Sequence, residues 1–316
     1  MEGRIEVLRN PQRMALRRYL VFAAILVLAY ANPLLNLARL AFQVDLFSHA
    51  LLVPAITVYL IWLLRSRLAG EMGGARWPGV ILGLAGLALM PASWTMTGAG
   101  PQAPVDRLAV QILSFCFLLW SGGFILFGSR VMRRCAFPAL FLIFMIPLPS
   151  GVREALEVAL QRGSVEVGFK FIQLSGTPVF RTDLVFWMPG MAVEVTRECS
   201  GIRSTLVLFI TALLAGHLFL RSAWSRLLLA AIVIPLGIVR NAFRILVISM
   251  LCVHVDPSFI NSPIHRQGGP LFFALSLVPF LLILIWLRKI DRPAGSDSPT
   301  SHDARSDTDV GPPSLP

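Results

Sequence analysis

Long, uninterrupted runs of apolar residues limit the possible fold of this chain more than any other feature of its sequence. Several runs reach the roughly 17–25 residues that an α-helix needs to cross a lipid bilayer. Of the 316 residues, 56% are hydrophobic and 14% are charged, a composition that soluble domains do not reach. The runs lack the alternating pattern of a transmembrane barrel, and only helices and closed barrels satisfy their backbone hydrogen bonds in lipid. The sequence therefore predicts an all-α integral membrane protein.

The apolar runs predict about eight transmembrane helices. They lie near residues 19–40, 48–64, 78–94, 108–127, 135–147, 199–220, 223–253 and 270–287. The basic start of the chain resembles a signal peptide, but no small-residue cleavage site follows it, so we expect an uncleaved first span. Residues 1–292 form the expected polytopic membrane domain. Residues 293–316 are rich in Ser, Asp, Pro and Thr, which predicts a disordered cytoplasmic tail.

The distribution of lysine and arginine predicts that both ends of the chain are cytoplasmic. With the N-terminus inside, the inner connections hold most basic residues, whereas the short outer connections after the first and third spans hold only Arg39 and Arg107. Basic residues between positions 150 and 198 weaken this contrast without reversing it. The expected topology is N-in and C-in, so residues 150–198, the connection 256–269 and the outer ends of spans six and seven face outward.

Residues 150–198 form the only large extramembrane segment that the sequence predicts. Apolar residues from Val152 to Phe171 recur at roughly helical spacing, which predicts a short extracytoplasmic amphipathic helix on the membrane surface. Two apolar stretches on either side of Met188-Pro189-Gly190 predict a hairpin. Both elements fall between spans five and six, and the hairpin leads directly to Cys199.

Charged residues in apolar runs are the main candidates for function. Arg203, Arg240 and Arg244 lie within or at the ends of such runs, where an unpartnered charge costs about 2.5–3.5 kcal/mol on insertion scales. The expected topology brings Arg240 and Arg244 to the outer face of the membrane, together with Cys199 and His265. A thiolate nucleophile needs a base or nearby cation, and acyl chemistry needs a donor for the oxyanion. We therefore expect Cys199 to be the nucleophile, His265 its base and acid, and Arg244 the stabilising cation.

Each of these residues also has a simpler interpretation. A lone cysteine at a helix end is more often a small buried hydrophobe, and a disulfide from Cys199 to Cys252 would exclude a nucleophile. His265 lies in a predicted turn and would suit an exposed loop. Arg240 and Arg244 would extend to lipid head groups if they only snorkel.

The sequence predicts no cofactor and no metal. Its histidines and cysteines lack metal-ligand spacing, and it has no glycine-rich phosphate loop. The net charge of +11 does not indicate a type of binding partner until each basic residue is assigned to a side of the bilayer. The expected partner is therefore the lipid bilayer, and no nucleic acid is expected.

Four short motifs together resemble those of the exosortase/archaeosortase family of membrane transpeptidases. They are Glu198-Cys199-Ser200-Gly201-Ile202-Arg203-Ser204, Asn241-Ala242-Phe243-Arg244, His265 with Gly269, and the early stretch Asp45-Leu46-Phe47-Ser48-His49-Ala50-Leu51-Leu52-Val53-Pro54. They follow the family order over about residues 17–287. Ala50 stands where the early motif has glycine. Arg240 directly precedes Asn241, so either arginine is a candidate for the catalytic one, and the spacing from Asn241 favours Arg244.

The resemblance implies a cysteine protease/transpeptidase of the bacterial inner membrane. Such an enzyme cleaves C-terminal sorting signals of exported proteins, similar to PEP-CTERM signals, through a thioacyl intermediate, and transfers the product to an acceptor. Its substrates carry a short motif, a transmembrane helix and a basic cluster, and it is linked to exopolysaccharide. The implied catalytic residues are Cys199, Arg244 and His265, and the implied supporting residues are Glu198, Ser200, Gly201, Arg203, Arg240 and Asn241.

Two other classes of function compete with this one. A polytopic transporter would use the intramembrane arginines to bind an anionic solute. A non-catalytic polysaccharide-export factor would keep the cysteine motif without its chemistry.

Overall fold

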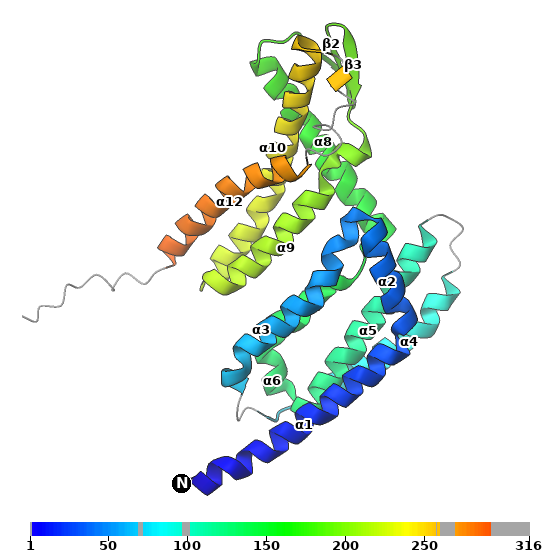
Figure 1. Cartoon of the computed structure of the whole chain (residues 1–316), viewed down its shortest axis with the longest axis vertical. Helices are drawn as coiled ribbons and strands as arrows, with labels where there is room; N and C mark the ends of the chain where they lie inside the picture. Colours follow the sequence, from blue (N-terminus) through cyan, green and yellow to red (C-terminus); the bar gives the residue numbers. More distant parts are fainter. Residues whose placement is uncertain (1, 69–71, 97–101, 257, 260–268, 292–316) are drawn as a thin grey trace, which may run out of the picture.

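Long helices account for most of the chain, and a small antiparallel sheet lies at one end of the molecule (Figure 1). The computed structural model describes residues 2–68, 72–96, 102–256, 258–259 and 269–291, so His265 and the tail 293–316 lie outside the described residues. The helices are α1 (Glu2–Ala29), α2 (Ala31–Gln43), η1 (Asp45–Leu51), α3 (Leu52–Leu68), α4 (Trp77–Thr95), α5 (Ala103–Phe127), α6 (Ser129–Arg134), α7 (Ala136–Phe141), η2 (Leu142–Met145), α8 (Ser150–Leu174), η3 (Arg197–Ser200), α9 (Ile202–Phe219), α10 (Ala223–His254) and α12 (Gly269–Ile290), where η marks a 3₁₀-helix. The strands are β1 (Phe180–Thr182), β2 (Val185–Met188) and β3 (Met191–Glu194).

Six helical segments are each long and apolar enough to cross a membrane. They are Asp45–Leu68, which joins η1 to α3, and the helices α4, α5, α9, α10 and α12. Two further pairs pass the same test jointly but are bent, by 71° between α1 and α2 and by 88° between Ala136–Met145 and α8. The described residues thus hold six to eight candidate spans, which confirms an all-α integral membrane protein. The predicted count of eight is the upper end of this range.

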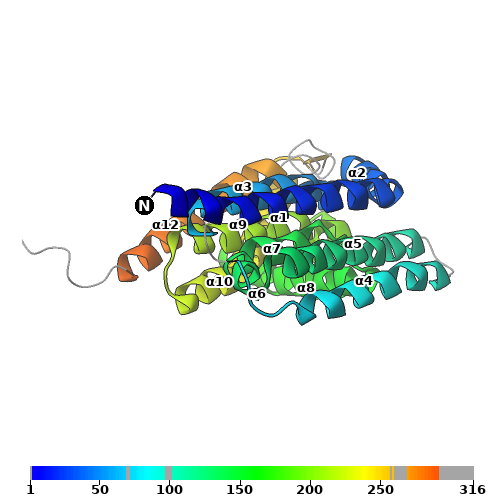
Figure 2. The same ribbon diagram turned by 90° about the horizontal axis from the view of Figure 1, so that it is seen from below.

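Small residues bring α4 and α5 into close contact. A Cβ atom added to Gly79 would lie 2.9 Å from the carbonyl oxygen of Ser121, and one added to Gly86 would lie 2.9 Å from the Leu118 side chain. The hydroxyl groups of Ser121 and Ser114 donate 2.6 Å hydrogen bonds to the carbonyl oxygens of Gly79 and Gly86, respectively. Such contacts hold helices together in lipid. Lipid tails are as apolar as the side chains, so burial of apolar surface alone does not drive helices to associate. On its other side α5 contacts α1 (Figure 2).

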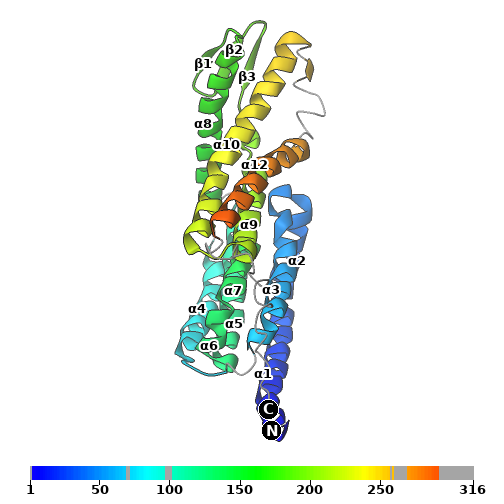
Figure 3. The same cartoon turned by 90° about the vertical axis from the view of Figure 1, so that its left-hand side faces the viewer.

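Within the described part of the chain, three clusters of buried apolar residues form the core. The first joins α1, α2, η1, α3, α5, the α7–η2 segment and α9. The second joins α9, α10 and α12, and the third joins α8, the sheet and the C-terminal half of α10. Figure 3 shows the third group, with the strands lying beside the end of α8 and the upper part of α10. The seventh predicted span therefore does more than cross the bilayer, because its second half also supports the sheet.

The sheet has one strand more than the predicted hairpin. β2 and β3 form that hairpin, with Met188 paired to Met191, and Gly190 adopts a positive φ of 80° in the turn. β1 then pairs antiparallel to β2, with Phe180 opposite Trp187. Three residues are too few for a strand to show an alternating pattern, so only tertiary pairing identifies β1.

α8 packs against α10 through small residues, whereas part of its predicted apolar face is exposed. Val152 and Leu156, two residues of the predicted apolar face, are 50% and 41% exposed. The face against α10 instead carries small residues: an added Cβ at Gly163 would lie 2.9 Å from Ile238, and Gly168 lies against Ala242 and Ile245. Close approach of two helices requires small residues, which a hydrophobic pattern does not detect.

A sharp corner precedes α8. The break after η2 contains Pro147 and Pro149, which disfavour continuation of a helix. Asp106 near the start of α5 then fixes the first residue of α8, because its two carboxylate oxygens accept 2.6 Å hydrogen bonds from the backbone N–H and the hydroxyl of Ser150. These interactions set the position of α8 across the end of the bundle, and thus the position of everything that packs on it.

Candidate active site

The turn from η3 into α9 carries Cys199. Gly201 ends η3 with a φ of 74°, a left-handed conformation that costs a residue with a Cβ about 1–2 kcal/mol. An added Cβ there would also lie 3.1 Å from the side chain of Asn241 and 3.3 Å from Nη2 of Arg240. Glycine is therefore needed both for the backbone conformation and for the close approach of α10.

The Cys199 side chain is half-buried at the edge of the cluster formed by α8, the sheet and α10. Its Sγ accepts a 3.6 Å hydrogen bond from the hydroxyl of Thr196, and its backbone N–H donates to the Thr196 carbonyl at 3.0 Å. Cys199 forms no disulfide. The thiol is thus held by a short local turn and is not sequestered in the core.

Two adjacent residues of α10 hold this turn in place by donating hydrogen bonds to its backbone carbonyl groups. Asn241 is 3% exposed and donates from Nδ2 to the carbonyl oxygen of Cys199 at 2.7 Å. Arg240 is 7% exposed and donates from Nη2 to the carbonyl oxygen of Gly201 at 3.3 Å and to the Thr205 hydroxyl at 3.2 Å. The other terminal nitrogen of Arg240, Nη1, is buried and has no hydrogen-bond partner among the described residues.

Cys199 and Arg244 line the same small cavity. Its volume is about 30 Å³, which is enough for a water molecule. Its walls are Val193, Glu194, Val195, Cys199, Asn241, Arg244, Ile245, Ile248 and Ser249. Residues that are separated by 45 positions in the sequence therefore meet around one space, Cys199 from η3 and Arg244 from α10.

The remaining predicted residues lie around this centre. Arg203 is not directed to the cavity but forms an ion pair with Asp45 of η1, with side chains 55% and 74% exposed. This pair joins the early motif to the cysteine motif. Ser200 is 2% exposed, and its hydroxyl has no partner among the described residues. The side chain of Glu198 and all of His265 lie outside the described residues.

No sequence pattern identifies Gln161, which the structure places beside the site. This residue of α8 is 4% exposed and donates from Nε2 to the carbonyl oxygen of Val195 at 2.6 Å. Gln161 and Asn241 therefore fix the backbone on both sides of the segment that ends at Cys199. A glutamine within a helix that carries several polar residues has no distinctive spacing, so only the fold shows its role.

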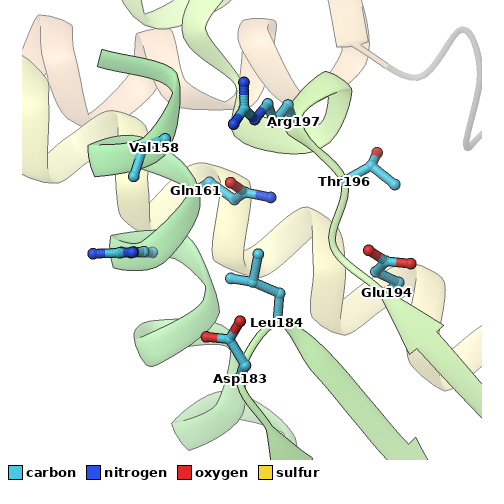
Figure 4. A pocket seen from close by; sticks show the side chains of 8 residues that line it. Val158, Gln161, Asp183, Leu184, Glu194, Thr196 and Arg197 are labelled. Atoms are coloured by element: carbon cyan, nitrogen blue, oxygen red, sulfur yellow. The ribbon is translucent and has the colours of Figure 1, made fainter. Parts of the chain in front are cut away.

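A second, larger cavity lies on the other side of this segment, between α8 and the sheet (Figure 4). Its volume is about 310 Å³. It is lined by Val158, Gln161, Arg162, Asp183, Leu184, Glu194, Thr196 and Arg197. Among the described residues, no group of three or more His, Cys, Asp or Glu side chains is arranged to hold a metal ion.

These features define a polytopic helical membrane protein in which a cysteine and an arginine line one cavity at the end of a helical bundle. A family model described as transmembrane exosortase (Exosortase_EpsH) matches residues 42–282, well over half of the chain. The chain therefore belongs to the exosortase family. The match extends over the early motif, the cysteine motif, Asn241, Arg244 and His265. No curated protein and no solved structure matches the chain.

Proposed function

We propose that this exosortase-family protein is a membrane-embedded cysteine protease/transpeptidase. It cleaves PEP-CTERM-like sorting signals at the C-termini of exported proteins and transfers the new carboxyl end to an acceptor. The observation that carries the proposal is the cavity shared by Cys199 and Arg244, because a nucleophile and a cation at one space suit attack on a carbonyl group. Membership of the exosortase family supports the same reaction class.

Each proposed catalytic residue has one part in the reaction. Cys199 attacks the scissile carbonyl carbon, and the peptide bond breaks to leave a thioester on Sγ. Arg244 stabilises the negative charge on the sulfur before attack and on the carbonyl oxygen during it. His265 accepts the thiol proton and donates it to the departing amine. The acceptor then releases the acyl group from Cys199.

The supporting residues act by holding Cys199 in place. Asn241 fixes the carbonyl of Cys199, while Arg240 fixes the turn at Gly201. Ser200 lies buried in the same turn, and Glu198 precedes the thiol. Arg203 ties the start of α9 to η1 through Asp45. Catalytic groups must be held within a fraction of an ångström, so these contacts bear on rate as well as on stability.

The same proposal includes the location of the enzyme and its partners. The chain lies in the bacterial inner membrane with both termini cytoplasmic, and the Cys199 cavity faces the periplasm or exterior. Because α8 lies at 88° to the Ala136–Met145 segment, an upright segment places α8 close to the membrane plane. The substrate's transmembrane helix reaches the site from within the bilayer. Residues 1–292 form the membrane domain, and residues 293–316 form a cytoplasmic tail.

A processing assay in cells tests the proposal. Cys199→Ala is expressed with an exported protein that bears a C-terminal motif, transmembrane helix and basic cluster, and conversion to the shorter form is followed on gels. We expect no conversion when Cys199→Ala is present at the same abundance as the wild-type enzyme. Cys116→Ala, in the buried core of α5, is the matched control and should keep processing. Normal conversion by Cys199→Ala would exclude a cysteine mechanism.

One observation favours the alternative of an anionic-solute transporter, namely the buried guanidinium of Arg240 with an unpartnered nitrogen among the described residues. Uptake of an anionic solute into vesicles, unchanged after alkylation of Cys199, would support it. A non-catalytic export factor would instead leave Cys199 unlabelled by a thiol-reactive probe at neutral pH.

A further inference from the structure

The 310 Å³ cavity is separated from the thiol by a single segment of chain. Glu194, the last residue of β3, lines both this cavity and the 30 Å³ cavity that contains Cys199. Thr196 also lines the large cavity, and its hydroxyl donates to Sγ of Cys199 at 3.6 Å. The segment Glu194–Thr196 therefore separates the two cavities, and a molecule in the large cavity would lie against it.

The walls of the large cavity offer hydrogen-bond acceptors. Asp183 in the β1–β2 turn and Glu194 form no ion pair with any described residue. Gln161 is 4% exposed and its Nε2 is already bonded to the Val195 carbonyl, while Oε1 has no bond within the described chain. Figure 4 shows the side chains of Asp183, Gln161 and Glu194 around the same space. An ammonium group, with three N–H donors and no acceptor, matches two carboxylates and an amide oxygen.

The two arginines of the cavity are not equivalent. Nη1 of Arg197 already bonds to Glu154 at 2.7 Å. Arg162 has no ionic partner among the described residues. Two uncompensated carboxylates against one uncompensated guanidinium leave the cavity with a net negative charge. The cavity therefore suits a molecule with a primary ammonium and, near it, one anionic group for Arg162.

We propose that this cavity is the acceptor subsite of the enzyme and that the acceptor is a primary amine, held as its ammonium by Asp183, Glu194 and Gln161. This inference rests on the proposed transpeptidase function. After docking, the ammonium loses one proton to solvent, and the amine then passes the edge of the Glu194–Thr196 segment, where its nitrogen attacks the thioester carbon. A carbon–nitrogen bond forms, the carbon–sulfur bond to Cys199 breaks, and the second proton passes from nitrogen to the departing thiolate. The products are an amide and the free thiol.

The partition of the thioester between transfer and hydrolysis tests the subsite. The full chain in nanodiscs is given a sorting-signal substrate together with ethanolamine, O-phosphoethanolamine or hydroxylamine, and the amide and acid products are quantified by mass spectrometry. Hydroxylamine is small and uncharged at neutral pH, so it needs no carboxylate. We expect Glu194→Gln and Asp183→Asn each to lower the transfer-to-hydrolysis ratio with ethanolamine about tenfold. With hydroxylamine, the ratio should stay within about twofold of the wild-type ratio.

Further arms define the acceptor and control the result. Arg162→Gln should abolish any preference for O-phosphoethanolamine over ethanolamine. Nanodiscs with and without phosphatidylethanolamine distinguish a lipid amine from a soluble one. Glu166→Gln removes a carboxylate that pairs with Arg181 outside both cavities and should match the wild-type ratio.

Two results would overturn different claims. A wild-type enzyme that forms no hydroxylamine-sensitive thioester would contradict the proposed function itself. A thioester that forms normally, with an ethanolamine ratio unchanged in the Asp183→Asn, Glu194→Gln double variant, would contradict the subsite alone.

Discussion

The α4–α5 contact and the α9–α10 contact bury polar groups of different kinds. Between α4 and α5 the groups are neutral, since Ser114 and Ser121 each donate one hydrogen bond to a glycine carbonyl. Between α9 and α10 they include a guanidinium and an amide, from Arg240 and Asn241, which donate to the turn between η3 and α9. Burying a charge costs far more than burying a hydroxyl group. The molecule thus places its costly groups where the thiol is held, and inexpensive ones where helices only pack.

Replacing the arginine that lines the Cys199 cavity should have the largest effect on activity. Arg244→Met removes the proposed stabilising cation, and we expect substrate cleavage to slow about 10²–10³-fold, as for loss of an oxyanion donor. Arg240→Met should slow cleavage only about tenfold, because the Gly201 carbonyl also accepts from the Thr205 backbone and hydroxyl. Cleavage of a purified sorting-signal substrate, normalised to enzyme concentration, measures both.

Thermal unfolding in detergent gives the complementary readout. Arg240→Met should not lower the unfolding temperature, because it also removes a buried nitrogen that lacks a partner among the described residues. If cleavage fell as far in Arg240→Met as in Arg244→Met, with both proteins folded, Arg240 would be the arginine that contacts the substrate.

Glycine variants at the two contacts should separate activity from packing. Gly201→Ala places a Cβ at a φ of 74° and against Asn241, so we expect about 1–2 kcal/mol of lost stability and a further loss of cleavage of about tenfold or more. Gly79→Ala brings a Cβ to 2.9 Å from a backbone oxygen of α5 and should destabilise without altering cleavage by the folded fraction. Cleavage per folded molecule, from activity and near-ultraviolet circular dichroism, distinguishes them. Equal losses of cleavage in both variants would mean that the turn needs no special geometry.

Loss of a neutral buried hydrogen bond at α4–α5 should have a smaller effect. Ser121→Ala removes the bond to the Gly79 carbonyl and should cost about 1 kcal/mol of unfolding free energy. Cleavage by the folded enzyme should be unchanged. The unfolding free energy is measured by denaturant titration in mixed micelles. A loss above about 3 kcal/mol, or a change in cleavage, would mean that this contact also positions the site.

The sequence predicts the spans better than it predicts the parts that pack at the sheet end. Apolar runs identify α3, α5 and α12, because bilayer thickness sets the length of each run. No contact with another segment is needed to recognise them. Cys199 and Arg244, which lie in two of the short motifs, both line one cavity in the structure. In contrast, β1, the inner face of α8 and the role of Gln161 depend on contacts between segments. The pattern of residues along the chain does not predict such contacts when the residues are small, few or polar.

A third kind of polar contact lies at the opposite end of α10, at the surface, and should have the smallest effect. Asp291, directly after α12, accepts hydrogen bonds from the Ser225 hydroxyl at 2.8 Å and from the backbone N–H groups of Arg221 and Ser222 at 3.0 and 3.1 Å. The bond from Ser225, followed by those from the backbone, holds the pKa of Asp291 below its usual range, against the opposing effect of partial desolvation. These bonds fix the start of α10 to the end of α12.

The direction of the resulting pH dependence follows from the lowered pKa. A carboxyl group whose pKa is lower in the folded state stabilises the fold fully at pH values above its pKa in the unfolded chain, which is about 4. This stabilisation is lost as the pH falls through the pKa of the folded state. The unfolding temperature of the wild type should therefore fall on acidification below about pH 4 more steeply than that of Asp291→Asn, whose side chain does not titrate. Glu166→Gln, which removes a surface carboxylate of α8, serves as the control and should follow the wild-type slope. Identical slopes for wild type and Asp291→Asn would show that the α10–α12 contact is independent of this charge.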